Sequence, residues 1–120
     1  MITHQFAERL AKEWIESWNS HNLESILSHY SADIELTSPI AVKLLGIEYG
    51  MVQGILALRN YFEKGLAALP DLEFEQIGIF TGVESITLLY KRKNGPTGAE
   101  VMMINDEGKI EKVIAHYSET

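Results

Sequence analysis

An apolar stripe on the predicted first helix is the feature that most constrains how this chain can fold. Four large side chains recur at every fourth position, namely Phe6, Leu10, Trp14 and Trp18. Side chains with this spacing share one face of a helix. Two indole rings on one face need a broad apolar surface to cover them. The helix therefore either seals an ordinary core or forms one wall of a pocket.

Three helices are predicted in the first part of the chain. Thr3 and Asn22 fit the N-cap positions of the first two, because their side chains can accept a bond from a free backbone N–H. A third helix follows Gly54, and Pro70 ends it. The predicted spans are about residues 3–20, 22–30 and 55–69. All three helices are amphipathic, so each must lie on another element.

Strand patterns begin at Ala32 and dominate from Leu72 onward. Asn94-Gly95 predicts a tight reversal, and Asn105–Gly108 predicts a type I turn closed by a glycine bulge. The predicted strands are residues 32–39, 72–80, 84–92, 98–105 and 109–117. Helices followed by an antiparallel meander predict an α+β fold, with the helices on one face of the sheet.

The apolar residues of the segment 40–53 follow neither the helical nor the strand spacing well. Its glycines recur at four-residue spacing, which outside a membrane helix is a weak packing signal. We expect a flexible apolar loop here. A segment this long without structure is unusual in a small domain, so a functional lid or a short extra strand remains open.

Length and composition limit the class of protein. The 120 residues predict one domain, 1–120. A net charge of −7 argues against a nucleic acid partner, and the absence of a long apolar run argues against a membrane. The chain has no cysteine, which favours a reducing compartment, and we expect a cytoplasmic location. The basic cluster Lys91–Lys93 is interpreted as a solvated hairpin end.

The last strand is apolar on both of its faces. Ile110 and Ile114 are assigned to one face, and Val113, Ala115 and Tyr117 to the other. A half-exposed sheet would show polar alternation, so the second face should be covered as well. No predicted helix remains to cover it. We therefore expect a homodimer that forms through the outer face of the sheet.

Several short motifs in this order carry a family resemblance. They are Trp18–Leu23, Tyr30–Ile34, Ser38-Pro39, Gly54–Phe62 and the closing Asn105–Ile110. The chain resembles the SnoaL-like and ketosteroid isomerase branch of the nuclear transport factor 2-like superfamily along nearly its whole length. This resemblance implies a cone, in which a curved sheet wraps against a long first helix and leaves a deep apolar cavity.

The resemblance also implies roles for three positions. In the isomerases of the family, a carboxylate before the first strand's proline moves a proton, while a tyrosine and a protonated carboxyl hold the oxyanion. These positions fall here on Ser38, Trp14 and Glu100 respectively. A serine without a neighbouring base cannot accept a proton near neutral pH, and an indole N–H cannot shuttle one. Ketosteroid isomerase chemistry is therefore not expected.

Glu100 and Ser38 are the candidate catalytic residues. Glu100 shares a strand face with Met102, so if that face points inward, burial should raise its pKa. The alternative is a solvated carboxylate at a frayed strand end. The candidate ligand contacts are Trp14, Trp18, Tyr30, Tyr61, Phe62, Met102 and Tyr117. Plain core packing is the alternative for each of these side chains.

No metal or nucleotide cofactor is expected. The four histidines lack metal-ligand spacing, and His116 is better suited to a structural or interface role. Asp33 and Glu35 flank Ile34 and are interpreted as surface residues. No phosphate-binding glycine loop or nucleophile elbow is present.

Two functional hypotheses remain open. The first is a dimeric protein that binds a small, mainly apolar metabolite between the first helix and the sheet. If it is an enzyme, we expect cofactor-free isomerisation, cyclisation or dehydration, with Glu100 as acid and with Trp14 and Ser38 orienting the substrate. The second is a non-catalytic ligand-binding or dimerisation module whose cavity is closed by side chains.

Overall fold

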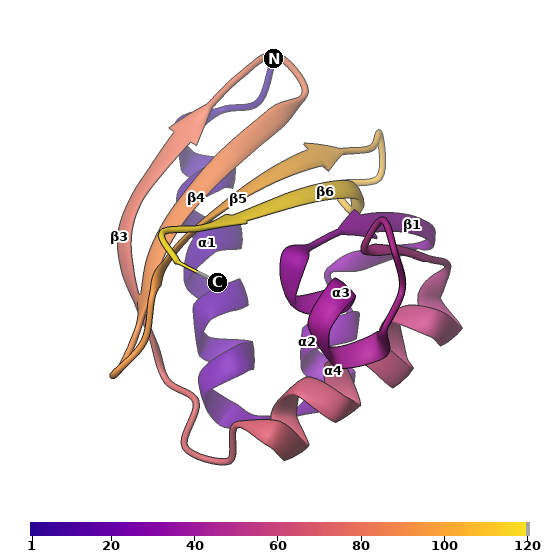
Figure 1. Ribbon diagram of the computed structural model, residues 1–120. Coiled ribbons are helices and arrows are strands. Elements are labelled where there is room, and N and C mark those ends of the chain that lie inside the picture. Colours follow the sequence, from indigo (N-terminus) through magenta and orange to yellow (C-terminus); the bar gives the residue numbers. More distant parts are fainter. Residues whose placement is uncertain (120) are drawn as a thin grey trace.

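Four helices lie on the concave side of a curved, six-stranded sheet (Figure 1). The computed structural model describes residues 1–119. Its helices are α1 (His4–Ser20), α2 (Leu23–Leu27), α3 (Pro39–Leu45) and α4 (Ile55–Ala68). Its strands are β1 (Tyr30–Thr37), β2 (Met51–Gln53), β3 (Phe74–Thr81), β4 (Ser85–Arg92), β5 (Thr97–Ile104) and β6 (Ile110–Tyr117). The predicted α+β class is confirmed.

Helix α1 begins and ends as the sequence predicts. The Thr3 side chain accepts a hydrogen bond from the backbone N–H of Phe6 at 3.1 Å. His21 ends the helix in the left-handed conformation, with φ 57°, and its N–H bonds the carbonyl of Trp18. Trp14 and Trp18 are buried, and the helix lies against β3. The apolar stripe therefore faces the sheet.

The second helix is shorter than predicted. Asn22 caps it by accepting a hydrogen bond from the Ser25 N–H at 3.1 Å, but α2 ends at Leu27. Tyr30 is the first residue of β1 and pairs with Ile110 of β6. The prediction that the helix reaches Tyr30 is wrong, because strand pairing with a distant part of the chain overrides local helical spacing.

The sheet has the strand order β2-β1-β6-β5-β4-β3. Strands β3 to β6 form the predicted antiparallel meander, whereas β1 pairs with β6 in parallel. Both predicted turns are confirmed. Asn94 has φ 60° in the β4–β5 hairpin, and Gly108 has φ 78° and donates its N–H to the Asn105 carbonyl at 2.9 Å.

Residues 40–53 are ordered by a helix and a strand. Ser38 caps α3, because its Oγ accepts a hydrogen bond from the Ile40 N–H at 3.1 Å. Gly50, with φ 65°, turns the chain into β2, and a Cβ there would lie 2.5 Å from the Ser38 carbonyl oxygen. Strand β2 pairs with β1. The expected flexible loop is wrong, and the alternative of a short extra strand is confirmed for Met51–Gln53.

A register shift alters the faces of β6. Met103 pairs with Lys112, but Ile104 pairs with Ile110, so one extra residue lies in β6. Ile110 is consequently fully buried with Val113, while Ile114 is 41% exposed on the outer face. The prediction that Ile110 and Ile114 share a face is wrong, because strict alternation does not anticipate a bulge.

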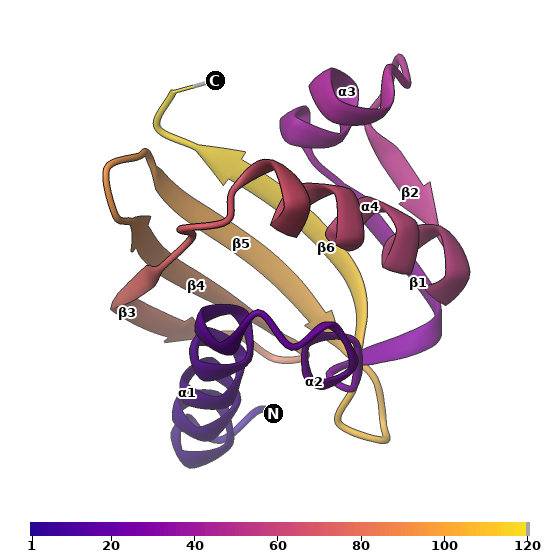
Figure 2. The ribbon, with the colours of Figure 1, turned by 90° about the horizontal axis from the view of Figure 1, so that it is seen from below.

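The helices divide the concave side between them. Helix α1 lies against β3, and α4 lies against β1, so together they flank the middle of the sheet (Figure 2). Asn19 fastens the end of α1 to β3 by exchanging two side-chain hydrogen bonds with the backbone of Phe74, at 2.7 and 3.0 Å. Among residues 1–119, no helix is both long and apolar enough to cross a bilayer.

Candidate functional site

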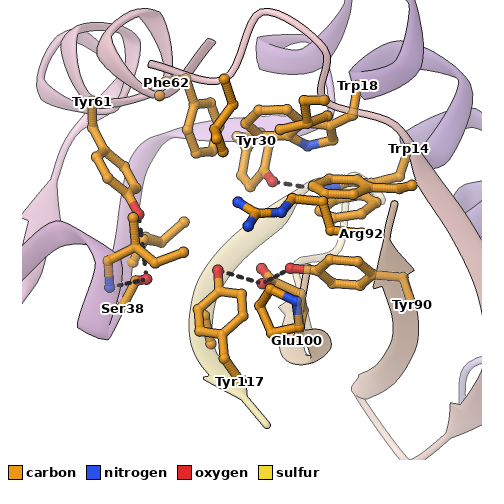
Figure 3. Close-up of a pocket in the computed structure, with 18 residues that line it drawn as sticks. Trp14, Trp18, Tyr30, Ser38, Tyr61, Phe62, Tyr90, Arg92, Glu100 and Tyr117 are labelled. Carbon is orange, nitrogen blue, oxygen red and sulfur yellow. Dashed lines mark hydrogen bonds between the residues drawn. The ribbon is translucent and has the colours of Figure 1, made fainter. Parts of the chain in front are cut away.

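A cavity of about 90 Å³ lies between α1, α4 and the inner face of the sheet (Figure 3). Most of its wall is aromatic or aliphatic. The polar groups that reach it belong to Ser38, Arg92, Glu100 and several tyrosines. The remaining walls come from Trp14, Trp18, Leu36, Ile40, Phe62, Gly65, Leu69, Leu72, Phe74, Pro96 and Ala115.

Glu100 is the central polar residue of the cavity. It lies on the inner face of β5 and is 5% exposed. Its Oε2 accepts hydrogen bonds from the hydroxyls of Tyr90 at 2.8 Å and Tyr117 at 3.5 Å (Figure 3). Its Oε1 has no hydrogen-bond partner within residues 1–119. One carboxyl oxygen is thus held in place while the other is left for a molecule in the cavity.

Burial raises the pKa of Glu100 to about 7. The hydrogen bonds from Tyr90 and Tyr117 work in the opposite direction, because they stabilise the charged carboxylate, and His116 also lowers the pKa. Near neutral pH the folded protein therefore populates both the acid and the carboxylate. A group with such a pKa can donate or accept a proton under ordinary conditions.

The tyrosines around Glu100 remain protonated. Burial and the charge of Glu100 raise the pKa values of Tyr30, Tyr90 and Tyr117 far above the usual range. Burial raises the pKa of Tyr61 to about 12. These hydroxyls act as hydrogen-bond donors at neutral pH and not as bases.

Ser38 is buried where α3 begins. Its Oγ accepts hydrogen bonds from the Ile40 N–H and, at 3.3 Å, from the Tyr61 hydroxyl. Within residues 1–119, no histidine or carboxylate hydrogen-bonds this hydroxyl. Without a neighbouring base, Ser38 is suited to hold a helix end and a tyrosine, and not to remove a proton.

The two tryptophans differ in how their N–H groups are satisfied. Trp14 Nε1 donates to the Tyr30 hydroxyl at 2.9 Å, and its ring stacks on Phe74 with centroids 5.6 Å apart. Trp18 packs edge-on against Phe62 at 4.8 Å. Its Nε1 is buried and has no partner among residues 1–119. A buried donor of this kind normally bonds to a ligand or an ordered water.

The structure brings together all but one of the candidate catalytic and ligand-contact residues predicted from the sequence. Met102 is fully buried in the core and does not line the cavity. The residues that do line it are Trp14, Trp18, Tyr30, Ser38, Tyr61, Phe62, Glu100 and Tyr117. Asp33 and Glu35 lie outside the cavity wall, Asp33 exposed and Glu35 half-buried.

Tyr90 and Arg92 are site residues that sequence reasoning missed. The Asn94-Gly95 turn sets Tyr90 opposite Gly98, two residues from Glu100, so pairing the two strands would have revealed the contact. A Cβ on Gly98 would lie 2.5 Å from Tyr90 Cζ, so glycine leaves room for the ring. The solvated interpretation of the basic cluster is wrong for Arg92, which is half-buried on the inner face of β4.

Comparison with known proteins identifies the family. A cone of this architecture with a polar pocket floor is the nuclear transport factor 2-like fold. The family model for the SnoaL-like domain matches residues 11–117. The chain therefore belongs to the SnoaL-like family. None of the curated proteins with which it was compared matches it.

Solved structures extend this comparison. A SnoaL-like protein of unknown function from Burkholderia thailandensis E264 has 36% sequence identity and a TM-score of 0.93, with 98% of each chain covered. A protein described as a ketosteroid isomerase from Kribbella flavida has 13% identity and a TM-score of 0.75, over 97% of this chain and 80% of that one. SalBIII, an epoxide hydrolase/cyclase-like enzyme in pyran ring formation of salinomycin, has 16% identity and a TM-score of 0.75, over 99% and 95%. The last two share the fold alone.

The hydrogen bond from Tyr90 gives a test of the site's electrostatics. Tyr90→Phe removes a donor that stabilises the Glu100 carboxylate, so the pKa of Glu100 should rise by about one pH unit. Carbon NMR titration of the side-chain carboxyl measures this value. Tyr49→Phe is the matched control, since Tyr49 is 81% exposed. An unchanged or lower Glu100 pKa in Tyr90→Phe would contradict the assigned bond.

Proposed function

We propose that this chain binds a small, mainly apolar molecule in the cavity and that Glu100 transfers a proton to or from it. The observation that carries the proposal is the arrangement of the Glu100 carboxyl. Two tyrosine hydroxyls bond one oxygen, the other has no partner within residues 1–119, and burial raises the pKa to about 7. These are the properties required of a general acid–base group.

The rest of the wall supports a ligand with an apolar body and a polar end. Aromatic rings cover most of the cavity, and the buried Trp18 Nε1 forms no hydrogen bond among the described residues, although it lies near enough to the Tyr30 hydroxyl to lower the pKa of that group. Tyr30 presents a hydroxyl to the same space. A carbonyl or ether oxygen on a ligand would supply the acceptor that these donors need.

Cofactor-free isomerisation, cyclisation or dehydration is the reaction class that fits these groups. Each needs a proton to move at one polar atom of the substrate while water is excluded. In this proposal Glu100 moves the proton, and Trp14 and Ser38, whose hydrogen bonds hold them in the cavity wall, orient the substrate by contact. The description of SalBIII names pyran ring formation, and that of the Kribbella flavida neighbour names a ketosteroid isomerase, and both reactions fall within this class.

The size of the cavity favours a second candidate, a non-catalytic module of the same fold. At about 90 Å³, the cavity is well below the roughly 300–1,000 Å³ of most ligand sites. Stacked and tilted rings of Trp14, Phe74 and Tyr90 occupy much of the space beside it. In this alternative the rings pack as core, and the protein acts through its surface.

Ligand binding and turnover together separate the proposed function from a non-catalytic ligand-binding or dimerisation module. A thermal shift screen of cyclic ketones, steroids, terpenoids and polyketide fragments should yield at least one stabilising compound, which at 100 times its Kd adds about 2.7 kcal/mol. Glu100→Gln keeps a hydrogen-bonding group, so it should bind that compound but lose roughly 10²- to 10⁴-fold in any turnover.

Glu111→Gln is the matched control for this experiment, because Glu111 is exposed on β6 outside the cavity. It should leave both binding and turnover unchanged. Absence of any stabilising compound would contradict the proposal and favour the non-catalytic module. Full turnover in Glu100→Gln would contradict the role of Glu100.

We further propose a homodimer through the convex face of the sheet, in a cytoplasmic setting that suits a chain without cysteine. No helix of residues 1–119 covers that face (Figure 1). Phe80, Val101 and Ile114 form an apolar row across it, interrupted by Thr87, and His116 lies in the next row. Phe80 is 59% exposed, which is unusual for a solvated sheet face.

Light scattering tests the dimer directly. The expected mass is twice the 13.5 kDa of one chain. Ile114→Lys introduces a charge in the apolar row and should shift the protein toward the monomer, whereas Glu111→Lys at a neighbouring exposed position should not. A mass of 13.5 kDa for the unmodified protein at working concentration would contradict this interface.

A further inference from the structure

We propose that the ligand is an anion, a small apolar carboxylic acid whose carboxylate binds Arg92 at the edge of the cavity. This inference rests on the proposed binding function and specifies its ligand class. It follows from the position of one guanidinium, from the groups around it and from the shape of the space on either side.

Arg92 continues the inward-facing row of β4. Leu88 and Tyr90 precede it on the same face and are buried, and Arg92 itself is half-buried. Figure 3 shows its guanidinium among the side chains that line the cavity, drawn between Tyr30 and Tyr117. Within residues 1–119 this guanidinium has neither a hydrogen-bond acceptor nor an ion-pair partner. A cation that faces an apolar wall without an anion is suited to bind one from a ligand.

The β4–β5 hairpin lies directly against the Arg92 side chain. Gly95 donates its N–H to the Arg92 carbonyl at 2.9 Å, and the Arg92 N–H bonds the Pro96 carbonyl at 3.1 Å. The guanidinium lies over Gly95 so closely that a Cβ there would collide with Nε and Nη2 of Arg92. The absence of a side chain at Gly95 lets the guanidinium lie against the turn in this position, although a flexible arginine side chain could also move aside.

A larger, open hollow lies beyond Arg92. A second hollow of about 680 Å³ shares Leu69, Leu72 and Arg92 with the first, so the two are adjacent. Its wall is mainly polar and includes Asp71 and Glu73. A ligand too large for 90 Å³ can place its apolar end among the aromatic rings and extend as far as Arg92. Its charged group would then lie at the boundary between the two hollows.

The local charges favour a single carboxylate. Lys93 pairs with Glu73 at 3.6 Å, and the Lys91 ammonium bonds the Gly95 carbonyl at 3.0 Å on an exposed side chain. Asp71 and Glu73 would repel a second negative charge at the outer hollow. The planar guanidinium matches a carboxylate through two parallel N–H···O bonds. In this orientation the other end of the ligand enters the cavity that Glu100 also lines.

Matched pairs of acid and amide test the inference, with octanoate and octanamide as the probes because a straight alkyl chain suits a narrow cavity. NMR or calorimetric titration at about pH 7.5 should show octanoate binding about 10-fold or more tightly than octanamide. Arg92→Met should reduce that preference to about twofold or less and leave the affinity for octanamide unchanged.

Lys12→Met is the control, because it removes one positive charge from an exposed position on α1 that lines neither hollow. It should retain most of the preference for octanoate. Equal binding of octanoate and octanamide, or a preference that survives in Arg92→Met, would overturn the role of Arg92 while the proposed function stands. Binding of neither probe, together with a failed screen of neutral compounds, would overturn both. Thermal unfolding of each variant without ligand confirms that it is folded.

Discussion

The candidate site depends on one buried carboxyl whose solvation has been replaced by hydrogen bonds. Glu100 lies at the floor of an apolar cavity, where an unpaired charge would be strongly disfavoured. Tyr90 and Tyr117 bond one of its oxygens and reduce that penalty without removing it, so the pKa settles near 7. The other oxygen then remains for a ligand. The same burial that disfavours the charge makes the group chemically useful.

Distant parts of the chain cooperate to hold this arrangement. The β4–β5 hairpin places Tyr90 over Gly98 and carries Arg92, so one hairpin supplies both a hydrogen-bond donor for Glu100 and a cation at the boundary between the two hollows. Helix α1 covers the floor with its indole rings, and Asn19 fixes its end to β3. The cavity thus joins an acid near neutral pKa to a guanidinium across an apolar surface. An acid at one end and a cation at the other would orient an elongated ligand in one direction.

Local patterns in the sequence predicted most of the fold, since helix caps, glycine turns and apolar spacing act over a few residues. Thr3, Asn22 and Asn94-Gly95 all occupy their predicted roles. The errors arose where contacts between residues far apart in the sequence determine the local structure. The end of α2, the strand β2 and the bulge in β6 depend on strand pairing that no local period encodes. In the site, Glu100 was recognisable from the sequence, but Arg92 was interpreted as a solvated charge. The face of the sheet on which Arg92 lies is known only once the pairing register of β4 is known.

Folding places Glu100 in a buried site that favours its protonated form. The free energy of unfolding of the unmodified protein, compared with that of Glu100→Gln across pH, measures this most directly. The carboxyl titrates near 4.5 when unfolded and near 7 when folded, so the folded state keeps a proton that the unfolded state has lost. Between these pH values, stability relative to Glu100→Gln should fall by roughly 3 kcal/mol as pH rises, then level off. A difference that stays constant from about pH 4 to about pH 8 would contradict the account.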